Sequence, residues 1–137
     1  RTLSYNEHIK FVSLNVNAGS LEKHEATMIL EIDGVKNNIK SFGNGPVDAT
    51  FNAIKDITKY QFRLTLYQVH AITAGTDAQG AVTVRLDDND FSSQARGSDP
   101  DIIVASAKAY INALNKLIIK KTKKTVKEIS NVNVKGV

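Results

Sequence analysis

The sequence predicts an α+β domain built from two βββα units that are related by approximate twofold symmetry. Three observations lead to this prediction. The 137 residues suit one domain, because domains usually hold roughly 100–150 residues. Period-two patterns and helical patterns follow one another in the order strand, strand, strand, helix, twice. A shift of 54 positions also places Gly43 and Pro46 on Gly97 and Pro100, so the same break precedes each helix.

The first repeat, about residues 8–60, begins with three strands in which apolar and polar residues alternate. These strands are expected over residues 8–18, 24–32 and 35–42. Asp33-Gly34 predicts a type I′ hairpin turn before the third strand, because both central residues of that turn need positive φ. Pro46 suits the first position of a helix to about Lys59, since proline has no N–H to satisfy there. The apolar stripe of this helix comprises Val47, Phe51, Ile54 and Ile57.

The second repeat, about residues 61–121, follows the same plan. Its strands are expected over residues 62–74, 80–87 and 91–96. A change in the phase of alternation predicts a β-bulge near Leu66-Tyr67. Asp99 is the expected N-cap and Pro100 the first residue of a helix to about Lys121. Its apolar stripe comprises Ile103, Ala107, Tyr110, Leu114 and Leu117.

Each helix is expected to pack on one face of its own small antiparallel sheet. The other apolar surface of such a unit needs a partner, and a dimer is the simplest solution. Residues 1–137 are therefore interpreted as a single dimer-forming domain, with residues 122–137 as a basic C-terminal tail.

The net charge of +4 is concentrated at the C-terminal end. Residues 116–137 hold seven lysines and one acid, which gives +6, whereas residues 1–115 hold 11 basic and 13 acidic residues, which gives −2. Lysines at the end of a helix complement its macrodipole. No aromatic residue is interleaved with these lysines to stack on bases, so a helix end is favoured over a nucleic-acid site.

The composition excludes several classes of protein. With 42% hydrophobic and 23% charged residues the chain resembles an ordinary globular domain, and the lack of cysteine excludes thiolate chemistry. The longest apolar run is residues 102–105, far below the roughly 20 residues that a membrane helix needs. We expect a cytoplasmic protein with no membrane partner. The first residue is not Met, which suggests a piece of a longer chain.

No catalytic or metal-binding constellation is evident. His8, His24 and His70 are scattered, and none has a second ligand at metal-site spacing. The acidic run 87–90 lacks the spacing of a calcium loop and is interpreted as a hairpin turn. We therefore expect no catalytic residue, no metal and no cofactor in this chain.

Two segments indicate ligand binding. Two glycines before the Pro46 helix leave its first N–H groups free for a carboxylate or phosphate. From the residues alone a plain strand-to-helix turn is favoured for residues 43–49, because the lysine of a Walker motif and the third glycine of a dinucleotide fingerprint are missing. The small residues of segment 71–80 would line a shallow apolar cavity, and Asp77 could hold an ammonium group. Together these features describe a zwitterionic aliphatic amino acid.

Segments 42–49, 66–80 and 101–115 resemble the C-terminal regulatory domain of the 2-isopropylmalate synthase family. The resemblance implies two βββα units that pair with a partner chain and bind leucine, the end product of the pathway, at the dimer interface. The family's catalytic part is a TIM barrel with a divalent metal, which condenses acetyl-CoA with 2-oxoisovalerate. None of its motifs is present, so the resemblance implies a non-catalytic regulatory fragment of that transferase, used for feedback inhibition.

Carried over residue by residue, the family's effector pocket falls on four groups of residues. They are Asn44, Gly45, Val47 and Asp48; Leu64, Tyr67 and Ala71; Ala78 and Gly80; and Ile102. We assign the helix N-termini to the ligand carboxylate and Asp48 or Asp77 to its ammonium group. The aliphatic residues would enclose the ligand side chain, with Tyr67 as a wall.

The sequence is also compatible with three alternatives. Citramalate synthase carries a similar domain that responds to isoleucine, and the two amino acids differ only in the position of one methyl group. A purely structural dimerisation module would ignore all amino acids. An RNA-binding module would use the lysine-rich end, but the body of the chain is acidic and stacking aromatics are absent.

Overall fold

A computed structural model describes residues 8–18, 23–71 and 79–135 of the chain. These residues form strands and helices in the predicted order, with two βββα units, so the predicted α+β fold is confirmed. The elements are β1 Ile9–Ala18, β2 His24–Ile32, β3 Val35–Gly43, α1 Pro46–Thr58, β4 Arg63–Ala71, β5 Gly80–Asp87, β6 Ser92–Asp99 and α2 Ile102–Lys135.

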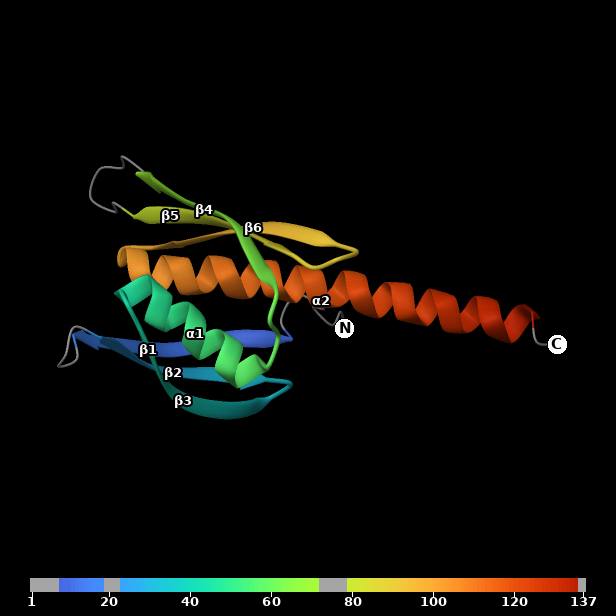
Figure 1. Cartoon of the computed structure of the whole chain (residues 1–137), viewed down its shortest axis with the longest axis horizontal. Helices are drawn as coiled ribbons and strands as arrows, with labels where there is room; N and C mark the ends of the chain where they lie inside the picture. The colour runs from blue at the N-terminus through green and yellow to red at the C-terminus, as the bar shows by residue number, and fades with distance from the viewer. Residues whose placement is uncertain (1–7, 19–22, 72–78, 136–137) are drawn as a thin grey trace.

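Each repeat forms a three-stranded antiparallel sheet, with strand orders β1-β2-β3 and β4-β5-β6. The two helices lie between the two sheets (Figure 1). α1 packs on β2 and β3, whereas α2 packs on β5 and β6 and also contacts α1 and β1. Because α2 reaches across to the first sheet, the two repeats share one core.

The hairpin turn and the bulge follow the local sequence. Asp33 and Gly34 have φ of 51° and 85°, which confirms the type I′ geometry that the Asp-Gly pair predicts. In β4 the register shifts between Leu64 and Leu66, close to the predicted bulge. β1 has a matching shift between Phe11 and Ser13, which alternation alone did not predict.

The repeated glycine of each unit allows a strand and a helix to approach closely. A Cβ added at Gly43 would overlap the backbone of Ala49 in α1. A Cβ added at Gly97 would lie 2.6 Å from the carbonyl oxygen of Ala105 and would overlap the Ala109 nitrogen, both in α2. Glycine at these two positions therefore lets each helix lie directly on the last strand of its own sheet.

The core between the sheets is apolar and contains few polar groups. The predicted stripes are confirmed at Phe51, Ile54, Tyr110 and Leu114, which are at most 5% exposed. The rings of Phe51 and Tyr110 lie 4.7 Å apart, so the two helices meet through an aromatic pair. Burial raises the pKa of Tyr110 to about 12.

One buried polar side chain connects the two ends of the chain. The Asn115 side chain in α2 accepts a hydrogen bond from the Ile9 N–H at 2.9 Å and donates one to the Ile9 carbonyl at 2.8 Å. Both residues are at most 2% exposed. Asn115 therefore satisfies backbone groups at the start of β1 that would otherwise be buried without partners.

The start of α2 differs from the prediction. The helix begins at Ile102 rather than Pro100, and the Asp101 carboxylate accepts a hydrogen bond from the Ile103 N–H at 2.8 Å. Asp99 instead accepts from the Asp101 N–H at 2.9 Å and pairs with Lys108 at 3.0 Å. These contacts lower the pKa of Asp99, the backbone hydrogen bond more than the lysine. Asp101, not Asp99, is thus the capping residue.

The end of α2 also differs, because the helix continues past Lys121 to Lys135 and projects beyond both sheets (Figure 1). Residues 122–135 are therefore helical rather than a separate tail. No glycine or proline interrupts residues 101–135, so nothing in the local sequence stops the helix. The lysines expected at a helix end lie within the helix instead.

α2 is long and apolar enough, by length and composition, to cross a membrane. However, 61% of its most apolar stretch is buried inside the fold. This burial is typical of the central helix of a globular core.

Candidate functional site

The predicted site residues lie at the starts of both helices, in β4 and at the start of β5. Figure 1 shows the starts of α1, α2 and β5 and the end of β4 at the same end of the molecule, opposite the projecting end of α2. Ala71 ends β4 and pairs directly with Gly80, the first residue of β5. Asp77 and Ala78 lie outside the described residues.

Tyr67 connects β4 with both helices. Its hydroxyl lies 2.8 Å from the Ser106 hydroxyl, which in turn donates to the Ile102 carbonyl at 2.8 Å. Since Ser106 uses its proton for that carbonyl, Tyr67 is the donor of the first bond. The Tyr67 ring also meets Phe51 of α1 edge to face, with centroids 5.8 Å apart. These contacts hold the Tyr67 side chain in place between β4 and the two helices.

Gly80 and Ile102 are in direct contact. The Ile102 side chain lies over Gly80, where an added Cβ would be 3.0 Å from Ile102 Cγ1 and would overlap Cδ1. The structure therefore brings Tyr67, Gly80 and Ile102 together around the start of α2. The hydroxyl chain from Tyr67 through Ser106 fixes the first turn of the helix that carries Ile102.

The loop before α1 forms a second part of the predicted site. Gly45 is the N-cap of α1, and no side chain caps this helix. The Asp48 carboxylate turns back to accept a hydrogen bond from the Asn44 N–H at 2.9 Å. Val47 is half-buried and packs against the core. Phe51, one turn further along α1, packs against the Tyr67 ring and so connects this helix with β4.

β4 is the least covered strand of the second sheet. Leu64 and Val69 are 41% and 49% exposed, although their direct partners in β5, Leu86 and Val82, are fully buried. Residues that pair directly across strands lie on the same face, so this apolar edge is on the helix side of the sheet. α2 packs mainly on β5 and β6, so Leu64 and Val69 of β4 stay partly exposed.

Ser106 is the site residue that the sequence analysis missed. It is fully buried in α2, four residues after Ile102. A serine on an otherwise apolar helix face is the signal that was available, because a buried hydroxyl needs a hydrogen-bond partner.

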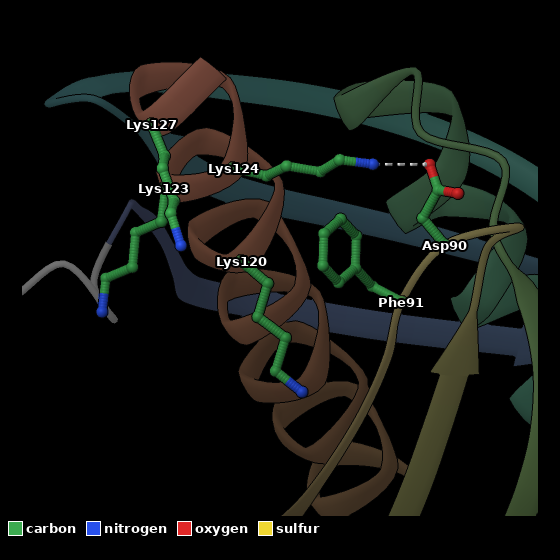
Figure 2. Close-up of a pocket in the computed structure, with 6 residues that line it drawn as sticks. All are labelled: Asp90, Phe91, Lys120, Lys123, Lys124 and Lys127. Atoms are coloured by element: carbon green, nitrogen blue, oxygen red, sulfur yellow. Dashed lines mark ion pairs between the residues drawn. The ribbon is translucent and has the colours of Figure 1, made fainter. Parts of the chain in front are cut away.

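The lysine-rich part of α2 faces the turn between β5 and β6. A groove of about 470 Å³ lies here. Figure 2 shows the residues that line it, Asp90, Phe91, Lys120, Lys123, Lys124 and Lys127. Lys124 lies 3.6 Å from Asp90 and 5.5 Å from the centroid of the Phe91 ring, and Lys120 donates to the Ser92 carbonyl.

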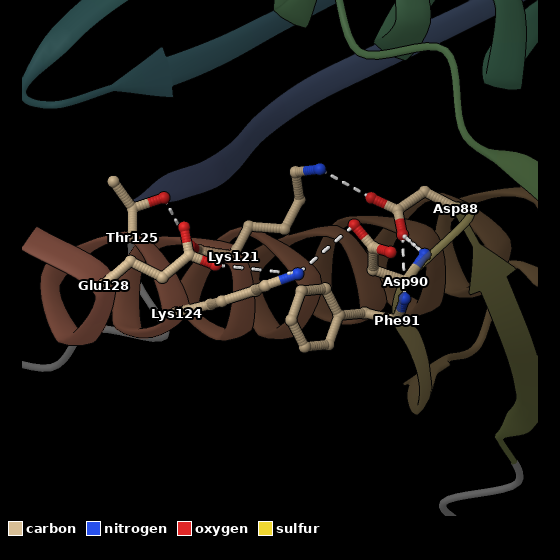
Figure 3. A network of polar contacts seen from close by, with 7 residues as sticks. All are labelled: Asp88, Asp90, Phe91, Lys121, Lys124, Thr125 and Glu128. Atoms are coloured by element: carbon tan, nitrogen blue, oxygen red, sulfur yellow. Dashed lines mark hydrogen bonds and ion pairs between the residues drawn. The ribbon is translucent and has the colours of Figure 1, made fainter. Parts of the chain in front are cut away.

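Asp88 is the centre of the polar network in Figure 3. It accepts hydrogen bonds from the N–H groups of Asp90 and Phe91 and pairs with Lys121 at 2.6 Å. The Lys121 ammonium and these N–H groups lower the pKa of Asp88 to about 2, and Asp88 raises the pKa of Lys121. These contacts show that several of the lysines attach the hairpin to α2. The predicted hairpin turn is confirmed, although Asp87 ends β5 and the turn comprises residues 88–91.

In the described part of the chain, no three His, Asp or Glu side chains lie close enough to hold a metal ion. The described residues of the predicted site combine aliphatic and aromatic side chains with the Tyr67 and Ser106 hydroxyls and with a helix start that no side chain caps.

Comparison with known proteins matches residues 1–118 to the family of the LeuA allosteric (dimerisation) domain. A 2-isopropylmalate synthase from Bradyrhizobium sp. (strain ORS 278) is 54% identical over 119 residues, which are 87% of this chain and 23% of that protein. The enzyme of the same name from Rhodopseudomonas palustris (strain TIE-1) is 48% identical over 130 residues, 95% of this chain and 25% of that protein. The chain thus spans about a quarter of the length of the curated relatives it matches.

Proposed function

Because this chain belongs to the LeuA allosteric (dimerisation) domain family, we propose that it is the regulatory domain of a 2-isopropylmalate synthase and binds leucine for feedback inhibition. The parent transferase would condense acetyl-CoA with 2-oxoisovalerate in a TIM barrel of the same cytoplasmic polypeptide. The divalent metal expected of that reaction belongs to the barrel, and this chain would contribute regulation alone.

The contact between Tyr67, Ser106, Ile102 and Gly80 is the observation that carries the proposal. It places a rigid aromatic wall, a branched aliphatic side chain and a position without a side chain at one helix start. Leucine would lay its isobutyl group against Tyr67 and Ile102. Its carboxylate would face the first N–H groups of α1, which no side chain caps, and Asp48 or Asp77 would take the ammonium group.

The open edge at β4 supports dimer formation. By the internal repeat, β4 corresponds to β1, whose apolar residues Phe11, Leu14 and Val16 are packed against the core because both helices contact that strand. Leu64 and Val69 have no such cover within the described chain. We propose that a second copy of the chain covers β4, which would place each leucine site beside the partner.

Inhibition would follow from linkage between the ligand and the dimer. Leucine that contacts both chains binds the paired state more tightly, and this difference in affinity can bias the distant barrels toward a less active state. Couplings of this kind are typically 1–3 kcal/mol.

Calorimetry tests the site with Tyr67→Phe and the matched variant Tyr60→Phe. Loss of the Tyr67 hydroxyl removes the hydrogen bond that joins β4 to Ser106 in the first turn of α2, so leucine affinity should fall by about 2–12-fold, the worth of one hydrogen bond. Tyr60 stacks on Phe62 away from the site, and its variant should bind leucine normally. No heat with millimolar leucine, or equal effects of both variants, would refute the assignment.

The isoleucine-responsive domain of a citramalate synthase is the alternative. The same titration with isoleucine decides between them, because a pocket shaped for one isomer discriminates against the other by roughly 1–3 kcal/mol. Stronger heat and tighter binding with isoleucine would favour the alternative.

A further inference from the structure

A second pocket lies beside the sheet of the first repeat. It is formed by the end of β1, the start of β2 and the starts of both helices. Its volume is about 380 Å³, which suits a small ligand. Leu14, Val16 and Ala18 of β1 and Ile103 of α2 line it with aliphatic groups. Its polar lining includes His24 and Asp101.

The internal symmetry relates this pocket to the proposed leucine site. The matching bulges align β1 with β4, so that Leu14 and Ala18 correspond to Tyr67 and Ala71. Ala18 pairs with His24 across β1 and β2, just as Ala71 pairs with Gly80 across β4 and β5. The second pocket therefore occupies in the first repeat the place that the proposed leucine site occupies in the second.

The two places differ in polarity. His24 of the first repeat is equivalent to Gly80 of the second repeat. Asp101, at the start of α2, is equivalent to Val47, at the start of α1. The Nδ1 atom of His24 is buried and has no hydrogen-bond partner among the described residues. A buried nitrogen without a partner is costly, so a ligand that bonds to it is favoured. Asp101 is exposed and uses one carboxylate oxygen for the Ile103 N–H, which leaves negative charge at this helix start.

We propose that this pocket is a second binding site, which takes a small zwitterionic amino acid with a branched aliphatic side chain. The ligand carboxylate accepts a hydrogen bond from the His24 ring, its ammonium group pairs with Asp101, and its side chain packs against Leu14, Val16 and Ile103. Each chain then holds two amino acids, one per repeat. The inference rests on the lining of this pocket and stands even if the second repeat binds no leucine.

Methyl NMR of the chain with added L-leucine tests the two sites separately. Leu14, Val16 and Ile103 report on the first-repeat pocket, and Val69 and Ile102 report on the second repeat. We expect both sets of methyl signals to shift in a saturable way with millimolar L-leucine. Static signals of the first set would overturn the proposal, whereas static signals of the second set alone would refute only the proposed leucine site.

Ala18→Leu and Ala71→Leu are matched variants, because the two alanines hold equivalent places in the repeats. Ala18→Leu should abolish the shifts of Leu14, Val16 and Ile103 and preserve those of the second repeat, with the reverse result for Ala71→Leu. If Ala71→Leu abolished both sets, the first-repeat shifts would be an indirect effect and the proposal would fail.

Asp101→Asn provides a variant that keeps the helix cap, since asparagine caps a helix as well as aspartate does. It should weaken binding in the first-repeat pocket at least about 5-fold, through loss of the charge that faces the ammonium group. An unchanged affinity in this variant, with the fold intact, would overturn the assigned orientation. The ligand 4-methylpentanoate, which lacks the ammonium group, should bind the wild-type pocket with a similarly reduced affinity.

Discussion

Replacing Gly97 or Gly80 by alanine separates what stabilises the fold from what forms the ligand site. At Gly97 the new Cβ meets backbone atoms of α2, with Ala105 O at 2.6 Å where ordinary contacts are 3.4–4 Å. Those backbone atoms belong to the buried face of α2 and can only move with the helix. At Gly80 the new Cβ meets the end of the Ile102 side chain, which can rotate.

These contacts determine how much each substitution should change the free energy of unfolding. Overpacking against a fixed backbone lowers the free energy of unfolding by about 1–3 kcal/mol. Alanine also has less conformational entropy than glycine in the unfolded chain, which offsets about 0.4–1 kcal/mol of this loss. Gly97→Ala should therefore lower the free energy of unfolding by about 2 kcal/mol. This value is near the upper end of the resulting range, because the backbone of α2 cannot move away from the new Cβ. A rotated Ile102 costs about 0.5–1.5 kcal/mol, so Gly80→Ala should be nearly neutral for stability. Its displaced Ile102 should nevertheless weaken leucine binding.

Urea unfolding followed by far-ultraviolet circular dichroism measures the first effect, since the chain has no tryptophan. Calorimetry with leucine on the same two variants measures the second. If Gly80→Ala destabilised the fold as much as Gly97→Ala, or if Gly97→Ala unfolded at the wild-type midpoint, the close-approach reasoning would be wrong.

Three further predictions concern the core, the charged hairpin and the dimer edge. Asn115→Leu should cost about 2–5 kcal/mol in urea unfolding, because it leaves both backbone groups of Ile9 buried without partners; a loss below about 1 kcal/mol would show that another group satisfies them. Lys121→Met should raise the pKa of Asp88 from about 2 part of the way to 3.8, measured by carboxyl NMR titration. Because folding lowers this pKa, the pair stabilises the fold above about pH 4 and the stabilisation fades as the pH falls toward 2, so the variant and wild type should converge in acid. Val69→Lys should weaken the dimer by at least about 10-fold in sedimentation experiments, through a charge buried in an apolar interface, and an unchanged dimer would place the interface elsewhere.

Features that depend on a few neighbouring residues could be predicted from the sequence. The Asp33-Gly34 turn, the bulge in β4 and the apolar stripes of both helices each follow from local backbone geometry or from residue spacing. The repeat itself was visible because Gly43 and Gly97 meet the same steric demand, a helix backbone lying directly on a strand.

Features that depend on contacts between distant segments could not be predicted. Lys121 and Lys124 of α2 pair with Asp88 and Asp90, and these contacts are not visible in the spacing of the sequence. The bond of Tyr67 to Ser106 and the two bonds of Asn115 to Ile9 likewise join residues far apart in the chain. For the predicted site, the structure brings Tyr67, Gly80, Ala71 and Ile102 together, whereas the loop before α1 reaches this group through Phe51.

Sedimentation equilibrium of the chain with and without leucine measures whether binding of the amino acid is linked to pairing of two chains. By linkage, a ligand that binds the dimer more tightly must strengthen the dimer by the same factor. The proposal predicts a dimer whose dissociation constant falls when leucine is added. A monomer at all concentrations, or a dimer whose dissociation constant is unchanged by saturating leucine, would contradict it.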